Sequence, residues 1–233
     1  MEAPFFIGAD VMDIYDVLIR DFPFLLKGLG VAIALLFCLL VIGLFLGLAI
    51  CLIQLYGPRS RFVQWPLIVY ERVFRGIPII IMLFIFFYGL SGVYDISAFA
   101  AAVLAMGLRS AAYQSQIFRS AFQSVPEGQM LAARAMGMSS SKAIAYIVLP
   151  QAIRHAIGPW TNEFSSQIKE TSLAYVIGVV ELTRQAHYII TSTQGNVLIV
   201  FAVVALLYFI LNRAGNSALY AFERKLSVPG FEK

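Results

Sequence analysis

Polar and ionisable side chains recur at helical spacing inside a strongly apolar part of the chain. Four of them form one stripe, at intervals of four, three and four residues: Arg109, Tyr113, Gln116 and Ser120. The planar guanidinium of Arg109 matches the geometry of a carboxylate, so it could bind a carboxylate of a substrate. It could equally form a structural ion pair with Glu163 or Glu170. Either role would place a charged group within an apolar helix.

A second group of polar residues lies between positions 155 and 182. The apolar residues there form one narrow stripe: Ile157, Trp160, Phe164, Ile168 and Tyr175. A helix with one thin apolar face and a polar remainder is typical of the wall of an internal cavity, and ionisable groups at membrane depth usually mark a transport pathway. An amphipathic helix lying on the membrane surface is the alternative. The candidate pathway residues are Arg109, Tyr113, Glu163, Lys169, Glu170, Thr171 and Ser172.

The composition indicates that the elements carrying these side chains lie in a membrane. Hydrophobic residues make up 60% of the 233 positions and charged residues only 13%, against about 25% charged in a soluble domain. A helix needs roughly 20 apolar residues to cross a bilayer. We therefore expect an all-α membrane bundle, a single domain over 1–233 with five spans, at about 28–55, 77–90, 96–122, 155–180 and 197–213.

The positions of the basic residues predict the orientation, with the N-terminus outside and the C-terminus inside. If 155–180 crosses, one side receives twelve of the 17 basic residues: Arg59, Arg61, Arg72, Arg75, Arg119, Arg134, Lys142, Arg154, Arg213, Arg224, Lys225 and Lys233. The other side receives Arg20, Lys27 and Arg184. Lys and Arg concentrate in cytoplasmic loops. Without this crossing the basic tail would fall outside.

The first span and the segment that follows it carry two local signals. Gly43 and Gly47 form a small-xxx-small pair, which permits close contact with another helix. Residues 62–75 mix apolar positions with Glu71, Arg72 and Arg75, a pattern that suits an amphipathic segment on the membrane surface.

The longest polar stretch, within a loop over 123–154, predicts two short helices. The first runs from Pro126 to about Met136 and ends at Gly137. The second runs from Lys142 to Val148 and is expected to stop at Leu149-Pro150. Small residues in the first helix would give it a low profile that the groove of a partner could receive. An ordinary cytoplasmic hairpin is the alternative.

This stretch resembles the EAA loop of importer permeases of the ABC family. That pattern is Glu-Ala-Ala, three residues, Gly, nine residues and Ile-x-Leu-Pro, and the matching positions are Leu131, Ala132, Ala133, Gly137, Ile147, Leu149 and Pro150. Leu131 stands where the family has Glu. Glu127 lies one turn earlier on the same face, and we hypothesise that it supplies the acidic contact to the ATPase instead.

The resemblance extends over most of the chain and narrows to the polar amino-acid uptake branch. Arg75-Gly76-Ile77-Pro78 is similar to the Arg-Gly-Thr-Pro of that branch, and 169–173 (KETSL) is similar to its Lys-Asp-Thr-Ser-Leu. The resemblance implies an amino-acid permease in a bacterial or archaeal cell (inner) membrane. It also implies a second permease subunit, identical or related, a pair of ATP-binding cassette subunits at the cytoplasmic loops and an extracytoplasmic solute-binding protein.

Several activities find no support in the sequence. No Gly-x4-Gly-Lys-Ser/Thr motif is present, so ATP and Mg are expected on the partner ATPase and no cofactor is expected in this chain. His155 and His187 stand alone, which gives no metal site. The basic excess follows from membrane orientation and does not indicate nucleic acid. A permease for another small polar solute, an ion-coupled secondary transporter and a non-transporting scaffold stay open, although no related halves typical of secondary transporters are visible.

Overall fold

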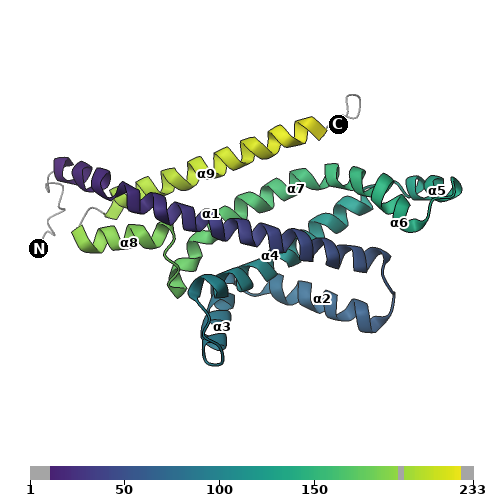
Figure 1. Ribbon diagram of the computed structural model, residues 1–233, viewed down its shortest axis with the longest axis horizontal. Coiled ribbons are helices and arrows are strands. Elements are labelled where there is room, and N and C mark those ends of the chain that lie inside the picture. Colours follow the sequence, from purple (N-terminus) through teal and green to yellow (C-terminus); the bar gives the residue numbers. More distant parts are fainter. Residues whose placement is uncertain (1–10, 194–196, 227–233) are drawn as a thin grey trace, which may run out of the picture.

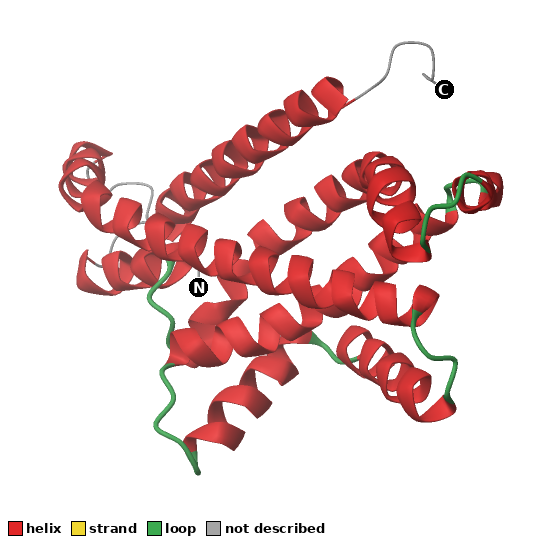
Figure 2. Cartoon of the chain, turned by 45° about the vertical axis from the view of Figure 1, so that its right-hand side comes forward, coloured by secondary structure: helices red, strands yellow, loops and turns green. Residues whose placement is uncertain are grey.

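The computed structural model describes residues 11–193 and 197–226, and this part of the chain is built from helices and loops without a strand (Figure 2). The α-helices are α1 (Val11–Tyr56), α2 (Arg61–Gly76), α3 (Ile79–Ser91), α4 (Ala98–Gln123), α5 (Glu127–Ala135), α6 (Ser140–Ala143), α7 (Leu149–Glu170), α8 (Leu182–Thr193) and α9 (Val197–Leu226). A π-helical turn, η1 (Ile144–Val148), and a 3-10 helix, η2 (Thr171–Ile177), complete them. The predicted all-helical class is confirmed.

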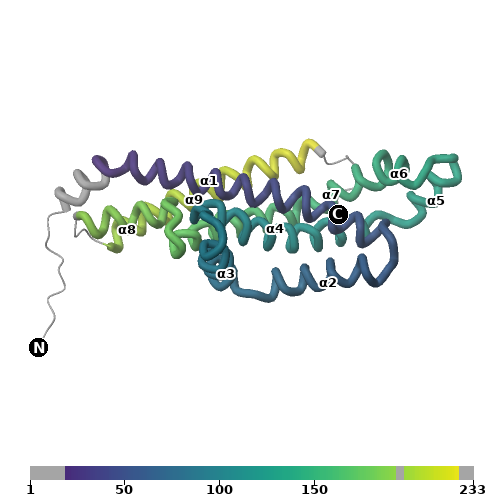
Figure 3. Tube along the Cα trace, turned by 60° about the horizontal axis from the view of Figure 1, so that its bottom comes forward, coloured from purple at the N-terminus to yellow at the C-terminus, as the bar shows by residue number. Residues whose placement is uncertain are grey.

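The long helices run along the longest dimension of the molecule. In Figure 1, α1, α4, α7 and α9 follow this direction, α5 and α6 project at one end, and α8 lies at the other beside the first part of α1. Figure 3 shows α2 running alongside the same bundle and α3 set at a sharp angle to α2. The segment between α4 and α7 is therefore held at one extremity of the fold.

Two helices in the described part are long and apolar enough to cross a membrane individually. They cover Ile19–Tyr56 and Val197–Lys225. The pair α2 and α3 meets the same criterion jointly but is bent by 107° at the break between them. Ile77 is extended there, with φ −90° and ψ 133°, because the ring of Pro78 disfavours a helical conformation in the preceding residue.

Close contact between α1 and α4 depends on the glycines of α1, as the sequence predicts. A Cβ at Gly43 would lie 2.1 Å from Gln114 Nε2 and 2.3 Å from Ser110 Oγ. A Cβ at Gly47 would lie 2.9 Å from the backbone oxygen of Ala111. The absence of side chains at these positions lets the backbones of α1 and α4 approach each other.

Buried apolar side chains form three separate cores. The largest joins α1, α3, α4 and η2 around Leu83 and Ile177. A second lies between α1, α4 and α7 around Cys51 and Phe118. The third joins α1, α8 and α9 around Leu25. Helix α4 thus packs on several partners at once, which fixes the direction of its polar side chains.

The carboxylate of Glu181, fully buried, attaches α8 to α9. Its oxygens accept hydrogen bonds from the backbone N–H groups of Thr183, at 2.8 Å, and Arg184, at 2.9 Å. It also accepts one from the hydroxyl of Tyr208, at 2.7 Å. The carboxylate therefore satisfies the free amides at the start of α8 and holds α9 against that end.

Helix α5 ends as the sequence predicts. Gly137 has a φ of 82°, in the left-handed region. The N–H of Met138 donates to the carbonyl of Ala133 at 3.1 Å and the N–H of Gly137 to that of Arg134 at 3.0 Å, a glycine-terminated helix end. Two residues later Ser139 begins the next helix, its hydroxyl accepting from the N–H of Lys142 at 3.4 Å.

The prediction that Leu149-Pro150 stops a helix is wrong. The helix that begins at Ser140 passes through the π-turn Ile144–Val148 and continues as α7. Pro150 lacks an N–H, and in a regular α-helix its ring would collide with the carbonyl four residues earlier. The wider turn, in which the N–H of Leu149 bonds to Ile144, relieves this collision. The second helix of the loop is consequently one rigid element with α7.

The segment expected as a span over 155–180 consists of two helix types. Helix α7 ends at Glu170 and tightens into the 3-10 helix Thr171–Ile177, which Gly178 terminates with a φ of 97°. The hydroxyl of Thr171 donates to the carbonyl of Ile168 at 2.7 Å, and that of Ser172 donates to the carbonyl of Lys169 at 2.6 Å. These side-chain bonds occupy carbonyls that the α-helix leaves free where it ends.

Candidate functional site: a charged cluster between α2, α4 and α7

Arg109 of α4 forms an ion pair with Glu170 of α7. The distance from Arg109 Nη1 to Glu170 Oε2 is 2.6 Å, and the two side chains are only 16% and 21% exposed. Ser166 donates a longer hydrogen bond, 3.5 Å, to the other oxygen of Glu170. Of the two partners that the sequence leaves open for Arg109, the structure therefore selects Glu170. Glu163 has a different partner.

The ring of Tyr113 lies beside two guanidinium groups. Arg109 Cζ is 4.6 Å from the ring centroid and Arg75 Cζ is 5.1 Å from it, both within the range of a cation–π attraction. Arg109 Nη2 is also 3.5 Å from the Tyr113 hydroxyl. Arg75 belongs to α2, so three helices contribute to one cluster: α2, α4 and α7.

Arg75 belongs to a helix that packs along another helix. Helix α2 packs along α4, where the Tyr70 hydroxyl donates to the backbone oxygen of Leu108 at 2.5 Å. Tyr70 in turn packs against Phe74, with ring centroids 4.7 Å apart. The amphipathic pattern of 62–75 therefore reflects contact with another helix, and Arg75 lies at the level of Tyr113.

Glu163 lies one turn before Gln167 on α7 and belongs to a chain of amide and hydroxyl groups. Gln167 Nε2 donates to Glu163 Oε1 at 2.8 Å and to Ser110 Oγ at 2.7 Å. Gln114 Nε2 also donates to Ser110 Oγ, at 3.0 Å, and Trp160 Nε1 donates to Gln114 Oε1 at 2.8 Å. Buried hydrogen-bonded side chains of this kind fix how two helices fit together. They therefore fix the position of α7 along α4 beside the ion pair.

Three of the predicted pathway residues do not join the cluster. Lys169 is exposed, and it forms no ion pair with a residue in the described part of the chain. Thr171 is buried and Ser172 half-buried, and both hydroxyls donate to carbonyls at the end of α7. The structure therefore brings together Arg109, Tyr113 and Glu170, with Glu163 in the adjoining network.

A second group of charged residues, which the sequence did not predict, lies further along α4. Glu71 of α2 is 4% exposed and accepts a hydrogen bond from Ser115 Oγ at 2.7 Å. Arg119 Nη2 lies 3.7 Å from Glu71 Oε2, and the guanidinium also donates to Gln54, at 2.7 Å, and to Gln116. Two sequence features could have suggested this contact. They are an acidic residue, Glu71, on the amphipathic segment 62–75 and the polar stripe on 96–122 that contains Gln116.

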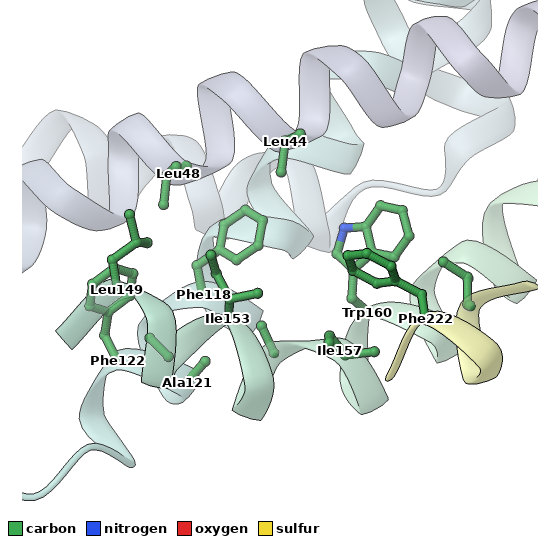
Figure 4. Close-up of a pocket in the computed structure, with 13 residues that line it drawn as sticks. Leu44, Leu48, Phe118, Ala121, Phe122, Leu149, Ile153, Ile157, Trp160 and Phe222 are labelled. Atoms are coloured by element: carbon green, nitrogen blue, oxygen red, sulfur yellow. The ribbon is translucent and has the colours of Figure 1, made fainter. Parts of the chain in front are cut away.

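An apolar cavity lies apart from the ion pair. It has a volume of about 430 Å³ and is lined by α1, α4, α7 and α9 (Figure 4). Its walls are Leu44, Leu48, Phe118, Ala121, Phe122, Leu149, Ala152, Ile153, Ala156, Ile157, Trp160, Leu219 and Phe222. With no ionisable lining residue, it offers nothing to pair with the charges of a zwitterion. Trp160 separates it from the polar network, since its Nε1 bonds to Gln114.

Comparison with known proteins assigns the family. Residues 50–228 match the binding-protein-dependent transport system inner membrane component family. The chain belongs to this family. It is therefore a transport permease of a membrane, not an enzyme, and it works with ATP-binding subunits and a solute-binding protein. The ion-coupled secondary transporter and the scaffold are set aside.

Individual relatives agree with this membership. The permease is 35% identical to the probable amino-acid ABC transporter permease protein YckA of Bacillus subtilis (strain 168), over 82% of this chain and 84% of that protein. It is 34% identical to the L-cystine transport system permease protein TcyB of the same organism, over 91% of each. Among solved structures, an amino acid ABC transporter crystallised with histidines superposes with a TM-score of 0.83 at 31% identity, over 94% of this chain and all of the other.

The loop residues of the permease are displayed at the projecting end. Glu127 begins α5 and is exposed, and Leu131, one turn later, is 68% exposed. Ala132 is exposed, whereas Ala133 is 6% exposed and packs inward. The remaining motif positions lie in the segment that connects α5 to α7. Gly137 follows the end of α5, and Ile147, Leu149 and Pro150 lie in or just after the π-turn. The exposed face of α5 is thus available to a partner.

Proposed function

We propose that this chain is the membrane permease subunit of an ATP-driven importer for amino acids. The observation that carries the proposal is the arrangement of α5, which projects at one end between the two helices that hold the charged cluster, α4 and α7 (Figure 1). The segment after α5 continues from Ser140 through the π-turn into α7 without a break, so a displacement that α5 passes on to this segment would reach α7. Movement at the partner surface would thereby open or close the path beside Arg109 and Glu170.

The proposed topology has five spans, at about 28–55, 77–90, 96–122, 155–180 and 197–213, in a bacterial or archaeal cell (inner) membrane. The N-terminus lies outside and the C-terminus inside, with the loop 123–154 in the cytoplasm. The end of the molecule that carries α5 also carries Arg59, Arg134 and Lys142, which supports this orientation through the positive-inside rule. The other end carries Arg184.

The proposed assembly contains two permeases, identical or related, above a pair of ATP-binding cassette subunits, with a solute-binding protein on the outer side. ATP and Mg are bound by the cassette subunits. Glu127, Leu131 and Ala132 contact the cassette subunit, with Glu127 in place of the acidic residue usual at position 131. Glu127 is the acidic residue nearest to position 131 in the sequence, and it is exposed.

The proposed path is lined by Arg109, Tyr113, Glu163 and Glu170, with Lys169, Thr171 and Ser172 at its edge. An amino acid carries both charges, and a site that offers both signs compensates for the lost hydration of each. Permeases that are similar to this chain carry different names, among them one for L-cystine, so another small polar solute is the second candidate. The opposed charges of Arg109 and Glu170 favour a zwitterion.

Two experiments test this function. The chain is expressed with a tagged neighbouring ATP-binding subunit, and co-purification of the two is expected. The full importer is then reconstituted in proteoliposomes and ATP-dependent uptake of labelled amino acids is measured for the wild type, Lys169→Ala and Glu170→Ala. Wild-type uptake rates in both variants would contradict the assigned path. Absence of any amino-acid uptake by the wild type would contradict the proposed function.

A further inference from the structure

Two cations share one aromatic ring in the charged cluster. The distances from the Tyr113 centroid to the guanidinium carbons are 4.6 Å for Arg109 and 5.1 Å for Arg75. The two guanidinium groups are therefore at most about 10 Å apart, where like charges still repel each other appreciably outside bulk water. The ring offers each a weak attraction, of about 0.5–2 kcal/mol for a cation–π contact, but no compensating charge.

Only one of these cations has a carboxylate. Glu170 lies 2.6 Å from Arg109, whereas Arg75 forms no ion pair within the described residues. Glu163, the other acidic group on this part of α7, accepts a hydrogen bond from Gln167 at 2.8 Å. Arg109 Nε, moreover, is buried and has no hydrogen-bond partner among the described residues. The cluster thus has guanidinium donors that its own carboxylates leave unused.

Arg75 lies at the edge of an apolar core, and its own side chain is exposed. The residues on either side of the Arg75-Gly76 pair, Phe74 and Ile77, pack against the core between α1, α3, α4 and η2. The guanidinium of Arg75 is therefore accessible to an incoming anion, while its neighbours in the sequence are held by the core. A guanidinium also presents two parallel N–H groups that fit the two oxygens of a carboxylate.

We infer that Arg75 binds the α-carboxylate of the transported amino acid, with Tyr113 positioning it beside Arg109. The carboxylates of Glu163 and Glu170 on α7 then face the ammonium group of the same molecule. This arrangement uses both signs of charge at the cluster and explains why two guanidinium groups are held next to a single ring. The inference rests on the proposed import of amino acids and adds a residue on α2 to the residues of α4 and α7.

The test uses the complete importer in detergent, without its solute-binding protein, so that ligand meets the permease directly. The probes are L-arginine, L-glutamine and L-glutamate, each beside its α-methyl ester, and thermal unfolding is followed as the probe concentration rises. The variants are Arg75→Gln, Arg75→Lys and, as matched control, Arg72→Gln, which removes an exposed arginine from the same helix. ATP-dependent uptake into proteoliposomes is measured for each variant in parallel.

The free acid of at least one probe is expected to raise the unfolding temperature of the wild type, and its ester is expected not to. Arg75→Gln should raise the half-saturating concentration about tenfold or more, as loss of a bidentate charged contact predicts. Arg75→Lys should retain part of the affinity and Arg72→Gln all of it. Equal response to acid and ester, no response to any probe, or unchanged affinity in Arg75→Gln would overturn the inference. Uptake by the wild type shows independently whether the importer function stands.

Discussion

Arg109 and Glu170 are 61 positions apart in the sequence, yet their side chains meet at 2.6 Å. The two residues lie on the helices that enter and leave the projecting loop segment, α4 and α7. The chain runs from α4 through α5, α6 and the π-turn into α7. The ion pair then connects α7 back to α4. If α5 moves, we expect either that the contact between Arg109 and Glu170 breaks or that α4 and α7 move together.

Neutralising both partners of this pair is expected to destabilise the permease less than the two single changes added together. Arg109→Gln or Glu170→Gln leaves a mostly buried charge alone, at a cost of about 3–5 kcal/mol. The double variant removes both charges, so its loss should be smaller than the sum of the two single losses. The measurement is the apparent unfolding temperature of the purified importer for all four members of the cycle.

The control for this cycle is Lys169→Gln, which removes an exposed charge adjacent to Glu170. It should change the unfolding temperature little, because exposed charges contribute only about 0–1 kcal/mol. Strict additivity of Arg109→Gln and Glu170→Gln would show that the two side chains do not interact in the assembled importer.

Coupling to the motor is expected to depend on one face of α5. Glu127 and Leu131 are exposed one turn apart. Glu127→Ala should lower the ATPase activity stimulated by loaded solute-binding protein by about threefold, the effect of one lost surface ion pair. Leu131→Glu, which introduces the acidic residue usual in the family, should restore activity in the Glu127→Ala background.

Gln129→Ala provides the comparison, since Gln129 is exposed on the same short helix but lies off the line from Glu127 to Leu131. If Glu127→Ala retains full stimulated ATPase activity and uptake, Glu127 does not replace the missing acidic residue, and the contact to the motor must come from elsewhere on α5.

Much of this arrangement could be predicted because it depends on neighbours in the sequence. The four-residue spacing of Gly43 and Gly47 indicates a close helix contact, and Gly137 marks a helix end. The partner of Arg109 stays open in the sequence, because choosing between Glu163 and Glu170 requires the register of α4 on α7. That register depends on contacts such as those of Gln114 with Trp160 and Ser110, which link distant segments.

The errors have the same physical origin. A proline that follows a helix in the sequence predicts that the helix ends there. In the structure a single π-turn accommodates Pro150 and the helix continues. Only the packing of the loop segment determines which of the two outcomes occurs. Arg75 and Glu71 look like the polar side of a surface helix. Their partners, Tyr113 and Arg119, lie on α4, so the pattern alone cannot distinguish lipid headgroups from another helix.

The left-handed conformation of Gly137 makes it a sensitive position in the loop. Gly137→Ala should cost about 1–2 kcal/mol, since a Cβ disfavours a positive φ, and Gly137→Asn should cost less. The local strain shifts the start of α6 relative to α5, so the stimulated ATPase activity should fall further than global stability does. Gly128→Ala is the matched control, because Gly128 lies in α5 itself with no atom within 4 Å of its added Cβ. Equal effects of the two alanines on activity would contradict this prediction.

The contact of α1 with α4 should tolerate no added carbon at Gly43. An alanine there would place its Cβ 2.1 Å from Gln114 Nε2 and 2.3 Å from Ser110 Oγ. Gln114 cannot simply swing aside, because it bonds to Ser110 and accepts from Trp160 on α7. Overpacking of this kind costs about 1–3 kcal/mol, and the displaced Gln114 would also loosen α7.

Gly30 offers a matched control on the same helix, since a Cβ there meets no atom within 4 Å. Gly30→Ala should leave the unfolding temperature unchanged or raise it slightly, because alanine favours a helix over glycine by about 1 kcal/mol. Gly43→Ala should lower it by several degrees and reduce uptake, through the loss of register between α4 and α7 at the Arg109–Glu170 pair. An unchanged unfolding temperature in Gly43→Ala would mean that α1 and α4 are further apart than the glycine contacts require.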